Sequence, residues 1–122
     1  MACIYESARA GSRQLIGGQY ETIMAGLACG EPNTFGLEVL LDYADYFIAA
    51  SDLLAAHGMR ILAAPHGNDH RIVSGESGAV TVGVASKILT DPHYADIKKQ
   101  LGIDAHSSLL FFSTEGATDQ KN

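Results

Sequence analysis

The residues best placed for chemistry lie in one short stretch, residues 74–83, where glycines and serines surround a carboxylate. Glycines at 75 and 78 allow backbone conformations and close approaches to a ligand that other residues resist. Ser77 is a typical N-cap for a helix over residues 78–89, and the N–H groups that begin such a helix favour an anion or the polar edge of a cofactor. The same pattern is also typical of a plain tight turn between a strand and a helix, because short glycine motifs have low specificity.

The elements that must position this stretch alternate along the chain. Apolar runs predict parallel strands near residues 2–5, 46–50 and 108–112, with a further short strand at 72–73. Helical spacing and capping residues predict a short turn at 22–27 and helices over 34–44, 52–63, 78–89 and 92–101. The first long helix is capped by Asn33 or Thr34, and the last begins at Asp91-Pro92 and ends at Gly102. Gly58 inside the second indicates close packing on a neighbour, and the apolar helix over 78–89 is expected to pack on the sheet. Strands and helices joined by short links predict an α/β fold, a partial three-layer sandwich with a mostly parallel sheet. We expect residues 1–122 to form one partial domain.

Polar residues follow several of the predicted strands. They form three clusters, namely Glu6-Ser7, Glu76-Ser77-Gly78 and Ser113-Thr114. Ligands of open parallel sheets bind outside the carboxyl ends of the strands, so the three clusters are candidates for one site. Each cluster by itself also has the ordinary interpretation of solvated polar residues at the end of a strand.

Histidines and cysteines give weaker signals. His66 and His70 are four residues apart beside Asp69. The residues between them are turn-forming, so the two imidazoles do not share a helix face and we predict no metal site. Cys3 and Cys29 form no metal-binding grouping. Two buried, reduced thiols are the preferred interpretation, and a disulfide is the alternative if the two Cα atoms lie within about 7 Å.

Composition limits the class of protein. The chain has 122 residues, of which 47% are hydrophobic and 18% charged, as in ordinary globular proteins with room for one core. A net charge of −6 without a cluster of basic residues argues against nucleic acid or an anionic membrane as a partner. No apolar run approaches the ~20 residues that span a bilayer, and the start lacks a secretory pattern. We therefore expect a cytoplasmic protein.

Several stretches, in order along nearly the whole chain, resemble diaminopropionate ammonia-lyase. They are residues 23–33 (IMAGLACGEPN), 58–60, 67–69, 74–80 (SGESGAV) and 113–119. More distantly, the pattern is similar to threonine and serine dehydratases, which share the tryptophan-synthase-β fold. The resemblance implies a homodimeric pyridoxal-phosphate enzyme of fold type II. Its amino-acid substrate would be 2,3-diaminopropionate, and α,β-elimination would give pyruvate and ammonia.

The resemblance also implies roles for four residues. Ser113 or Thr114 should face the pyridine nitrogen of the cofactor, while Glu76 and Gly75 should border its ring and 3′-oxygen side. A neutral hydroxyl beside the nitrogen leaves the pyridine unprotonated, which suits elimination over transamination. No catalytic residue is expected within the chain itself.

Other parts of the family pattern fall outside the resemblance, which covers only the later part of the family's chain. These are the Schiff-base lysine, the acid/base residues and the glycine loop that grips the phosphate. The lysines present, Lys87, Lys98, Lys99 and Lys121, are expected to be surface residues. The resemblance therefore implies a fragment that binds the cofactor weakly or not at all and is inactive alone. We expect it to self-associate or to rely on a complementing N-terminal fragment. The alternative is a non-catalytic small-molecule-binding or interaction module derived from the same half-domain.

Overall fold

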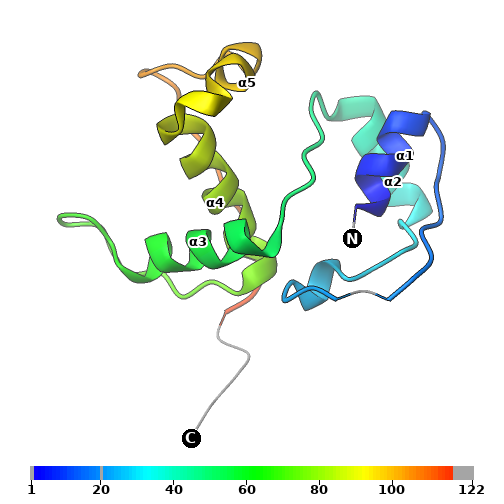
Figure 1. Ribbon diagram of the computed structural model, residues 1–122, viewed down its shortest axis with the longest axis horizontal. Helices are drawn as coiled ribbons and strands as arrows, with labels where there is room; N and C mark the ends of the chain where they lie inside the picture. The colour runs from blue at the N-terminus through cyan, green and yellow to red at the C-terminus, as the bar shows by residue number, and fades with distance from the viewer. Residues whose placement is uncertain (1, 20, 117–122) are drawn as a thin grey trace, which may run out of the picture. The chain divides into compact units, whose positions relative to one another are not determined.

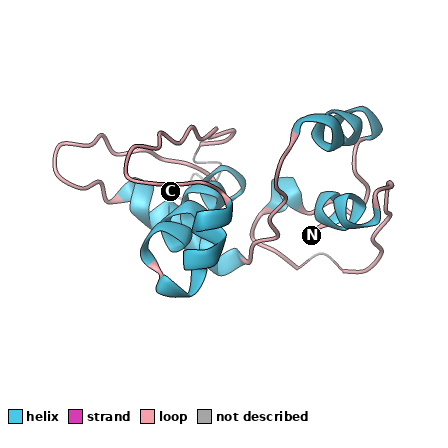
Figure 2. Ribbon diagram, turned by 90° about the horizontal axis from the view of Figure 1, so that it is seen from above, coloured by secondary structure: helices cyan, strands magenta, loops and turns pink. Residues whose placement is uncertain are grey.

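The computed structural model describes residues 2–19 and 21–116, which belong to two compact units, Met1–Ala49 and Ala50–Asn122. The first unit contains α1 (Cys3–Ala10), the 3-10 turn η1 (Ala25–Leu27) and α2 (Thr34–Tyr43). The second contains α3 (Asp52–Ala63), α4 (Glu76–Thr90), η2 (Pro92–Tyr94) and α5 (Ala95–Gln100). The described residues form only helices and loops, as Figure 2 shows.

The chain begins in a helix where we predicted a strand over residues 2–5. In α1 the fully buried Ser7 donates its hydroxyl to the carbonyl of Cys3 at 2.7 Å. Glu6 and Arg9, one turn apart, form an ion pair of 3.1 Å between Oε2 and Nη1. The strand prediction was wrong because an apolar run of four residues is too short to distinguish a strand from the first turn of a helix.

Helix α2 begins at the predicted cap. The side chain of Asn33 accepts a hydrogen bond of 2.8 Å from the backbone N–H of Gly36. Leu37, only 4% exposed, is the residue that α2 buries in the first unit. Just before α2, the Pro32 carbonyl accepts a hydrogen bond of 3.1 Å from the Nε of Arg13. The predicted helix and its cap are therefore confirmed.

Helices α3 and α4 cross in direct backbone contact (Figure 1). A Cβ atom built at Gly58 of α3 would lie 1.9 Å from the carbonyl oxygen of Ala79, and one at Gly83 of α4 would lie 1.9 Å from that of Leu54. Only glycine permits this approach at either position. The sequence prediction that Gly58 marks close packing on a neighbour is confirmed. The neighbour is α4, which we had expected to pack on a sheet.

The remaining predicted strands are not formed within the described residues. Residues 46–50, 72–73 and 108–112 all lie outside helices, and none has a strand assignment. Many of their apolar side chains are exposed. A parallel strand needs neighbours for its backbone hydrogen bonds, so the sheet stays a prediction.

The segment after α4 begins and ends at the residues predicted for a helix over 92–101. Asp91 accepts a hydrogen bond from the His93 N–H at 3.1 Å, and Pro92 opens the 3-10 turn η2. Helix α5 follows, and Gly102, with φ of 65°, ends the segment as predicted. The single helix predicted over residues 92–101 is thus a turn plus a helix. Within residues 2–19 and 21–116, none of the helices has the length and apolar character to cross a membrane.

Candidate functional site

The start of α4 is where the structure brings two of the three predicted polar clusters together. Residues 74–78 meet residues 113–115, and we call these two segments the α4-start site. The backbone N–H of Gly75 donates to the carbonyl of Glu115 at 2.9 Å. Figure 1 shows how this happens, since the chain after α5 returns behind α4 to the end where α4 begins. The predicted proximity of these two clusters is therefore observed without the predicted strands.

Glu115 supplies the cap of α4 from far along the chain. Its carboxylate Oε1 accepts a hydrogen bond of 2.9 Å from the backbone N–H of Ser77. The helix starts at Glu76 with Gly75 in the N-cap position, and the helix's own residues provide no side-chain cap. The prediction that Ser77 caps a helix over residues 78–89 was wrong, because capping rules read only neighbouring residues. A carboxylate of the chain itself thus balances the positive end of the helix dipole.

Two hydroxyl groups form the polar centre of the α4-start site. The Oγ of Ser113 lies 2.8 Å from the Oγ of Ser74, which is only 5% exposed. The Ser74 hydroxyl also donates to the Gly75 carbonyl at 3.2 Å, and the Ser113 hydroxyl also donates to the Glu115 carbonyl at 3.3 Å. Each hydroxyl has one proton and two lone pairs. In this arrangement Ser113 donates to Ser74, and Ser74 donates to the Gly75 carbonyl. The exposed Ser113 hydroxyl must therefore rotate away from Ser74 to donate its proton to a ligand.

The two glycines of the site, Gly75 and Gly78, let another segment of the chain lie against the start of α4. A Cβ at Gly75 would lie 2.3 Å from the Cγ of Glu115. A Cβ at Gly78 would lie 3.0 Å from the Ser74 Oγ and 3.2 Å from the Thr114 nitrogen. Both positions therefore admit residues 113–115 against the helix start. The sequence analysis had expected these glycines to admit a ligand.

The four predicted cofactor residues lie in or beside this site. Ser113 and Thr114 are exposed, Gly75 is buried, and Glu76 is the half-buried first residue of α4. The structure holds Ser113 in a hydrogen-bond network, which distinguishes it from Thr114.

Sequence reasoning missed two residues that shape the α4-start site, Ser74 and Glu115. Both lie inside the two motifs that carry the resemblance, so the sequence contained a signal for them, although it was not used. One further polar atom stands out. Ser77 Oγ is buried and has no hydrogen-bond partner among the described residues.

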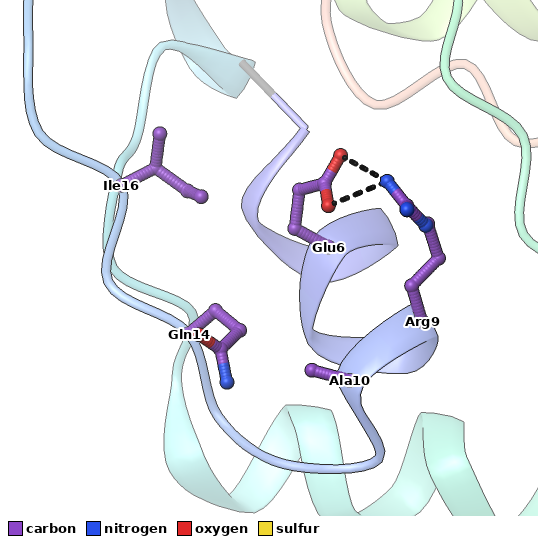
Figure 3. A pocket seen from close by; sticks show the side chains of 5 residues that line it. All are labelled: Glu6, Arg9, Ala10, Gln14 and Ile16. Carbon is purple, nitrogen blue, oxygen red and sulfur yellow. Dashed lines mark hydrogen bonds and ion pairs between the residues drawn. The ribbon is translucent and has the colours of Figure 1, made fainter.

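The third predicted cluster, Glu6-Ser7, is in the first unit and does not end a strand. The buried Ser7 accepts a hydrogen bond from the Gln14 N–H at 2.9 Å, which gives it a structural role. Glu6 lines a shallow pocket of about 230 Å³ together with Arg9, Ala10, Gln14 and Ile16 (Figure 3). Ligand pockets usually measure roughly 300–1,000 Å³. The pocket is therefore small for a cofactor, and the Glu6–Arg9 ion pair borders it.

Lysines of the described residues lie away from the α4-start site. Lys87 is in the last turn of α4, where it pairs with Asp91 at 3.4 Å. Eleven residues separate it from Glu76, which places it about 16 Å further along the helix axis. Lys98 and Lys99 belong to the last turn of α5. The fourth lysine, at position 121, is outside the described residues.

The cysteines and histidines complete the set of candidate ligands. Cys3 and Cys29 are both free thiols, so the disulfide alternative is wrong for this structure. Cys3 is buried as predicted, whereas Cys29 is exposed. Over residues 2–19 and 21–116, no three or more His, Cys, Asp or Glu side chains gather closely enough to hold a metal ion.

Comparison with known sequences gives a consistent result. The chain is 48% identical over 120 residues to diaminopropionate ammonia-lyase of Escherichia coli K12, and 46% identical over 119 residues to that of Salmonella typhimurium LT2. These matches cover 98% and 95% of this chain. The chain spans only about 30% of the length of either relative. No model of a known protein family matches the chain.

Solved structures agree with the sequence matches. A crystal structure of the Escherichia coli enzyme with an aminoacrylate-PLP azomethine reaction intermediate has a TM-score of 0.86 and 46% identity, covering 96% of this chain and 29% of that one. A complex of the same enzyme with D-serine has a TM-score of 0.87 and 45% identity, covering 97% and 29%. Pyridoxal phosphate is thereby confirmed as the cofactor of the parent enzymes. The resemblance drawn from the motifs is confirmed as well: in sequence and in backbone, this chain matches a part of diaminopropionate ammonia-lyase that makes up about 30% of that enzyme.

Proposed function

We propose that this chain supplies one wall of the pyridoxal-phosphate site of an enzyme that eliminates ammonia from 2,3-diaminopropionate. The observation that carries the proposal is the 48% identity over 120 residues to an enzyme of that activity. The finer fold prediction belongs to the same proposal. Residues 1–122 would form a single partial domain of fold type II, with a parallel sheet that is complete only in the whole enzyme.

The α4-start site fits one edge of the cofactor. Ser113 is exposed, and its hydroxyl, which donates to the buried Ser74 at 2.8 Å, can rotate to donate its proton to a ligand while its oxygen then accepts from Ser74. The buried, unpartnered Ser77 Oγ adds a polar atom that a ligand group can satisfy. These are neutral hydroxyl groups, which suit the ring nitrogen or the oxygen that is attached to the ring. The chemistry of the donor set therefore agrees with the edge of a pyridine ring.

The same residues do not fit the whole cofactor. Bound pyridoxal phosphate supplies an electron sink for the elimination, and its use also requires a lysine and an anchor for the phosphate. Lys87 is about 16 Å along α4 from the helix start. Glu115 already accepts from the Ser77 N–H, so this end of α4 is balanced by a carboxylate. We therefore assign the lysine and the phosphate anchor to sequence outside this chain.

Within such an enzyme, Ser113 would hold the ring nitrogen by donating its hydroxyl proton. A serine hydroxyl does not give up this proton near neutral pH, so the nitrogen stays unprotonated. Ser74 would fix the direction of the Ser113 hydroxyl, and Glu115 would fix residues 113–115 on the start of α4. Gly75 and Glu76 would border the ring, as the resemblance implies. Thr114 remains the alternative to Ser113 at the nitrogen.

The resemblance also supports the expected setting of the enzyme. We propose the cytoplasm as its compartment and a homo-oligomer as its assembled form. An amino-acid substrate is its small-molecule partner, without nucleic acid or membrane.

A graft tests the proposed function. The matching 120 residues of the Escherichia coli K12 enzyme are replaced by this chain, and pyruvate release from 2,3-diaminopropionate is measured. We expect the graft to release pyruvate and the separate chain to release none. A folded graft that binds pyridoxal phosphate without turnover would contradict the proposal and favour the non-catalytic binding module.

A further inference from the structure

The shallow pocket of the first unit has one charge of each sign in its wall (Figure 3). Its volume is about 230 Å³, and it is lined by Glu6, Arg9, Ala10, Gln14 and Ile16. A water molecule takes about 30 Å³ of liquid volume, so the pocket has room for roughly seven groups of that size. This is too little for a cofactor, but it is enough for a small amino acid.

Hydrogen bonds hold the two walls of the pocket together. The buried Ser7 of α1 accepts from the Gln14 N–H at 2.9 Å, which ties the segment after α1 to the helix. Two residues further on, the Ile16 N–H donates to the Gly30 carbonyl at 2.8 Å. The wall opposite α1 is therefore already fixed, and a ligand has to order little of the chain when it binds.

Arg9 keeps most of its hydrogen-bond donors for a ligand. The ion pair with Glu6 uses only Nη1 of Arg9, which lies 3.1 and 3.4 Å from the two carboxylate oxygens. Nε and Nη2 make no hydrogen bond with the residues that the structure describes. The Arg9 side chain is 65% exposed, so a carboxylate can reach this free edge. A guanidinium edge and a carboxylate form two parallel hydrogen bonds, which is a strong and directional contact.

Glu6 and Gln14 offer acceptors beside that edge. The two oxygens of a carboxylate provide about four acceptor positions, so Glu6 can accept further hydrogen bonds while it stays paired with Arg9. The Gln14 Nε2 donates to the carbonyl and the hydroxyl of Ser12 at 3.3 and 3.0 Å. Its Oε1 accepts no hydrogen bond within residues 2–19 and 21–116. An ammonium group has three donors and no acceptor, so it suits this set of oxygens.

We propose that this pocket binds a small neutral α-amino acid as a zwitterion, with its carboxylate on Arg9 and its ammonium group on Glu6 and Gln14. Ala10 and Ile16 leave an apolar place for a short side chain. A simple anion would meet the charge of Glu6, and a simple cation would meet that of Arg9. A zwitterion has no net charge, so the net charge of −6 on the chain does not oppose its approach.

An NMR titration of the full chain tests the site. L-Alanine is the probe, because it is small and carries both charges. We expect saturable shifts of the backbone amide signals in residues 6–16. The dissociation constant should be about 1–10 mM, since exposed ion pairs contribute little to affinity. Propionate and ethylamine each carry only one of the two charges, and each should bind at least tenfold more weakly than L-alanine.

Variants show whether the two charges carry the binding. Arg9→Gln and Glu6→Gln each remove one charge and should raise the dissociation constant for L-alanine at least fivefold. Both side chains are partly exposed and belong to the same helix, so neither change should unfold the chain. Arg60→Gln is the matched control, because Arg60 is also an exposed arginine in the last turn of a helix, α3. It should change the dissociation constant less than twofold.

Several results would overturn the proposal. They are the lack of a saturable shift, shifts spread over the whole chain, unchanged binding in Arg9→Gln, and propionate binding as tightly as L-alanine, which would mean an anion held by Arg9 alone. Should the free chain fail to fold, equilibrium dialysis of labelled L-alanine with the graft decides, because Arg9→Gln must there remove one bound molecule per chain. The pocket shares no residue with the α4-start site. Pyruvate release from the graft therefore tests the proposed function separately, and neither result implies the other.

Discussion

Gly58→Ala should destabilise the second unit, because the crossing of α3 and α4 has no space for one methyl group. The added Cβ would lie 1.9 Å from the Ala79 carbonyl oxygen and 2.8 Å from the Gly83 nitrogen. Both are backbone atoms, which cannot turn aside as a side chain can. Ordinary van der Waals contact begins at 3.4 Å, so α3 would have to move about 1.5 Å away from α4.

The expected loss of stability follows from two opposing terms. Overpacking by one methyl group costs roughly 1–3 kcal/mol, and the rigid backbone neighbours place Gly58 at the upper end. Alanine gains about 1 kcal/mol over glycine in a helix interior. The net loss is about 2 kcal/mol, which for a unit of this size lowers the melting temperature by roughly 8–16 °C.

Circular dichroism at 222 nm during heating measures this change. Gly36→Ala is the matched control, because Gly36 is also in a helix but the nearest atom to its added Cβ, Asn33 Oδ1, is at 3.5 Å. The control should be neutral or gain up to about 1 kcal/mol. If Gly58→Ala melts at the wild-type temperature or above it, the close backbone crossing is refuted.

Three further predictions concern the α4-start site and the surface near α5. Glu115→Ala should lower the free energy of unfolding in urea by about 0.5–2 kcal/mol, because α4 loses its cap. Glu115→Gln keeps an acceptor and should lose less stability. An Ala variant as stable as wild type would contradict the capping role. The His93 side chain, then the His93 backbone N–H and Lys87, lower the pKa of Asp91 from 3.8 to about 2. The folded pKa lies below the unfolded one, so the advantage of wild type over Asp91→Asn should be full above pH 3.8 and vanish as the pH falls to about 2. Thermal melts across that range check this, and a constant difference would count against it. In the graft, Ser113→Ala should slow pyruvate release by about 2–10-fold through the loss of one hydrogen bond, and Ser74→Thr should restore most of what Ser74→Ala loses. Full activity of Ser113→Ala would exclude Ser113 as the partner of the ring nitrogen and leave Thr114.

Helices were predictable where the signal was local. Asn33 caps α2 and Asp91 caps η2, because a cap is read within three residues of the helix start. Gly58 marked the helix crossing because a glycine in a helix interior usually has a packing reason. The start of α4 was misplaced by two residues, since its cap, Glu115, lies 38 residues from Ser77.

The apolar runs gave the least reliable predictions. Residues 2–5 are apolar on a helix rather than on a strand, which four residues cannot distinguish. Residues 108–112 have the composition of a buried strand but are exposed, and they form no backbone hydrogen bond within the part of the chain that the structure describes. Strand pairing depends on partners distant in sequence. Gly75 and Glu76 were candidates from the glycine stretch, and Ser113 and Thr114 from their place after an apolar run, whereas their roles toward a cofactor came only from the resemblance. Hydrogen bonds between distant residues, such as the one that Ser113 donates to Ser74, needed the structure.

The central claim is that this chain supplies the ring edge of the site while the lysine comes from outside it. The most direct measurement is to reduce the graft with borohydride in the presence of pyridoxal phosphate and to map the labelled lysine by mass spectrometry. We predict one label per chain, on a lysine of the Escherichia coli part. Stoichiometric labelling of one of the four lysines of this chain, Lys87, Lys98, Lys99 or Lys121, would contradict the claim.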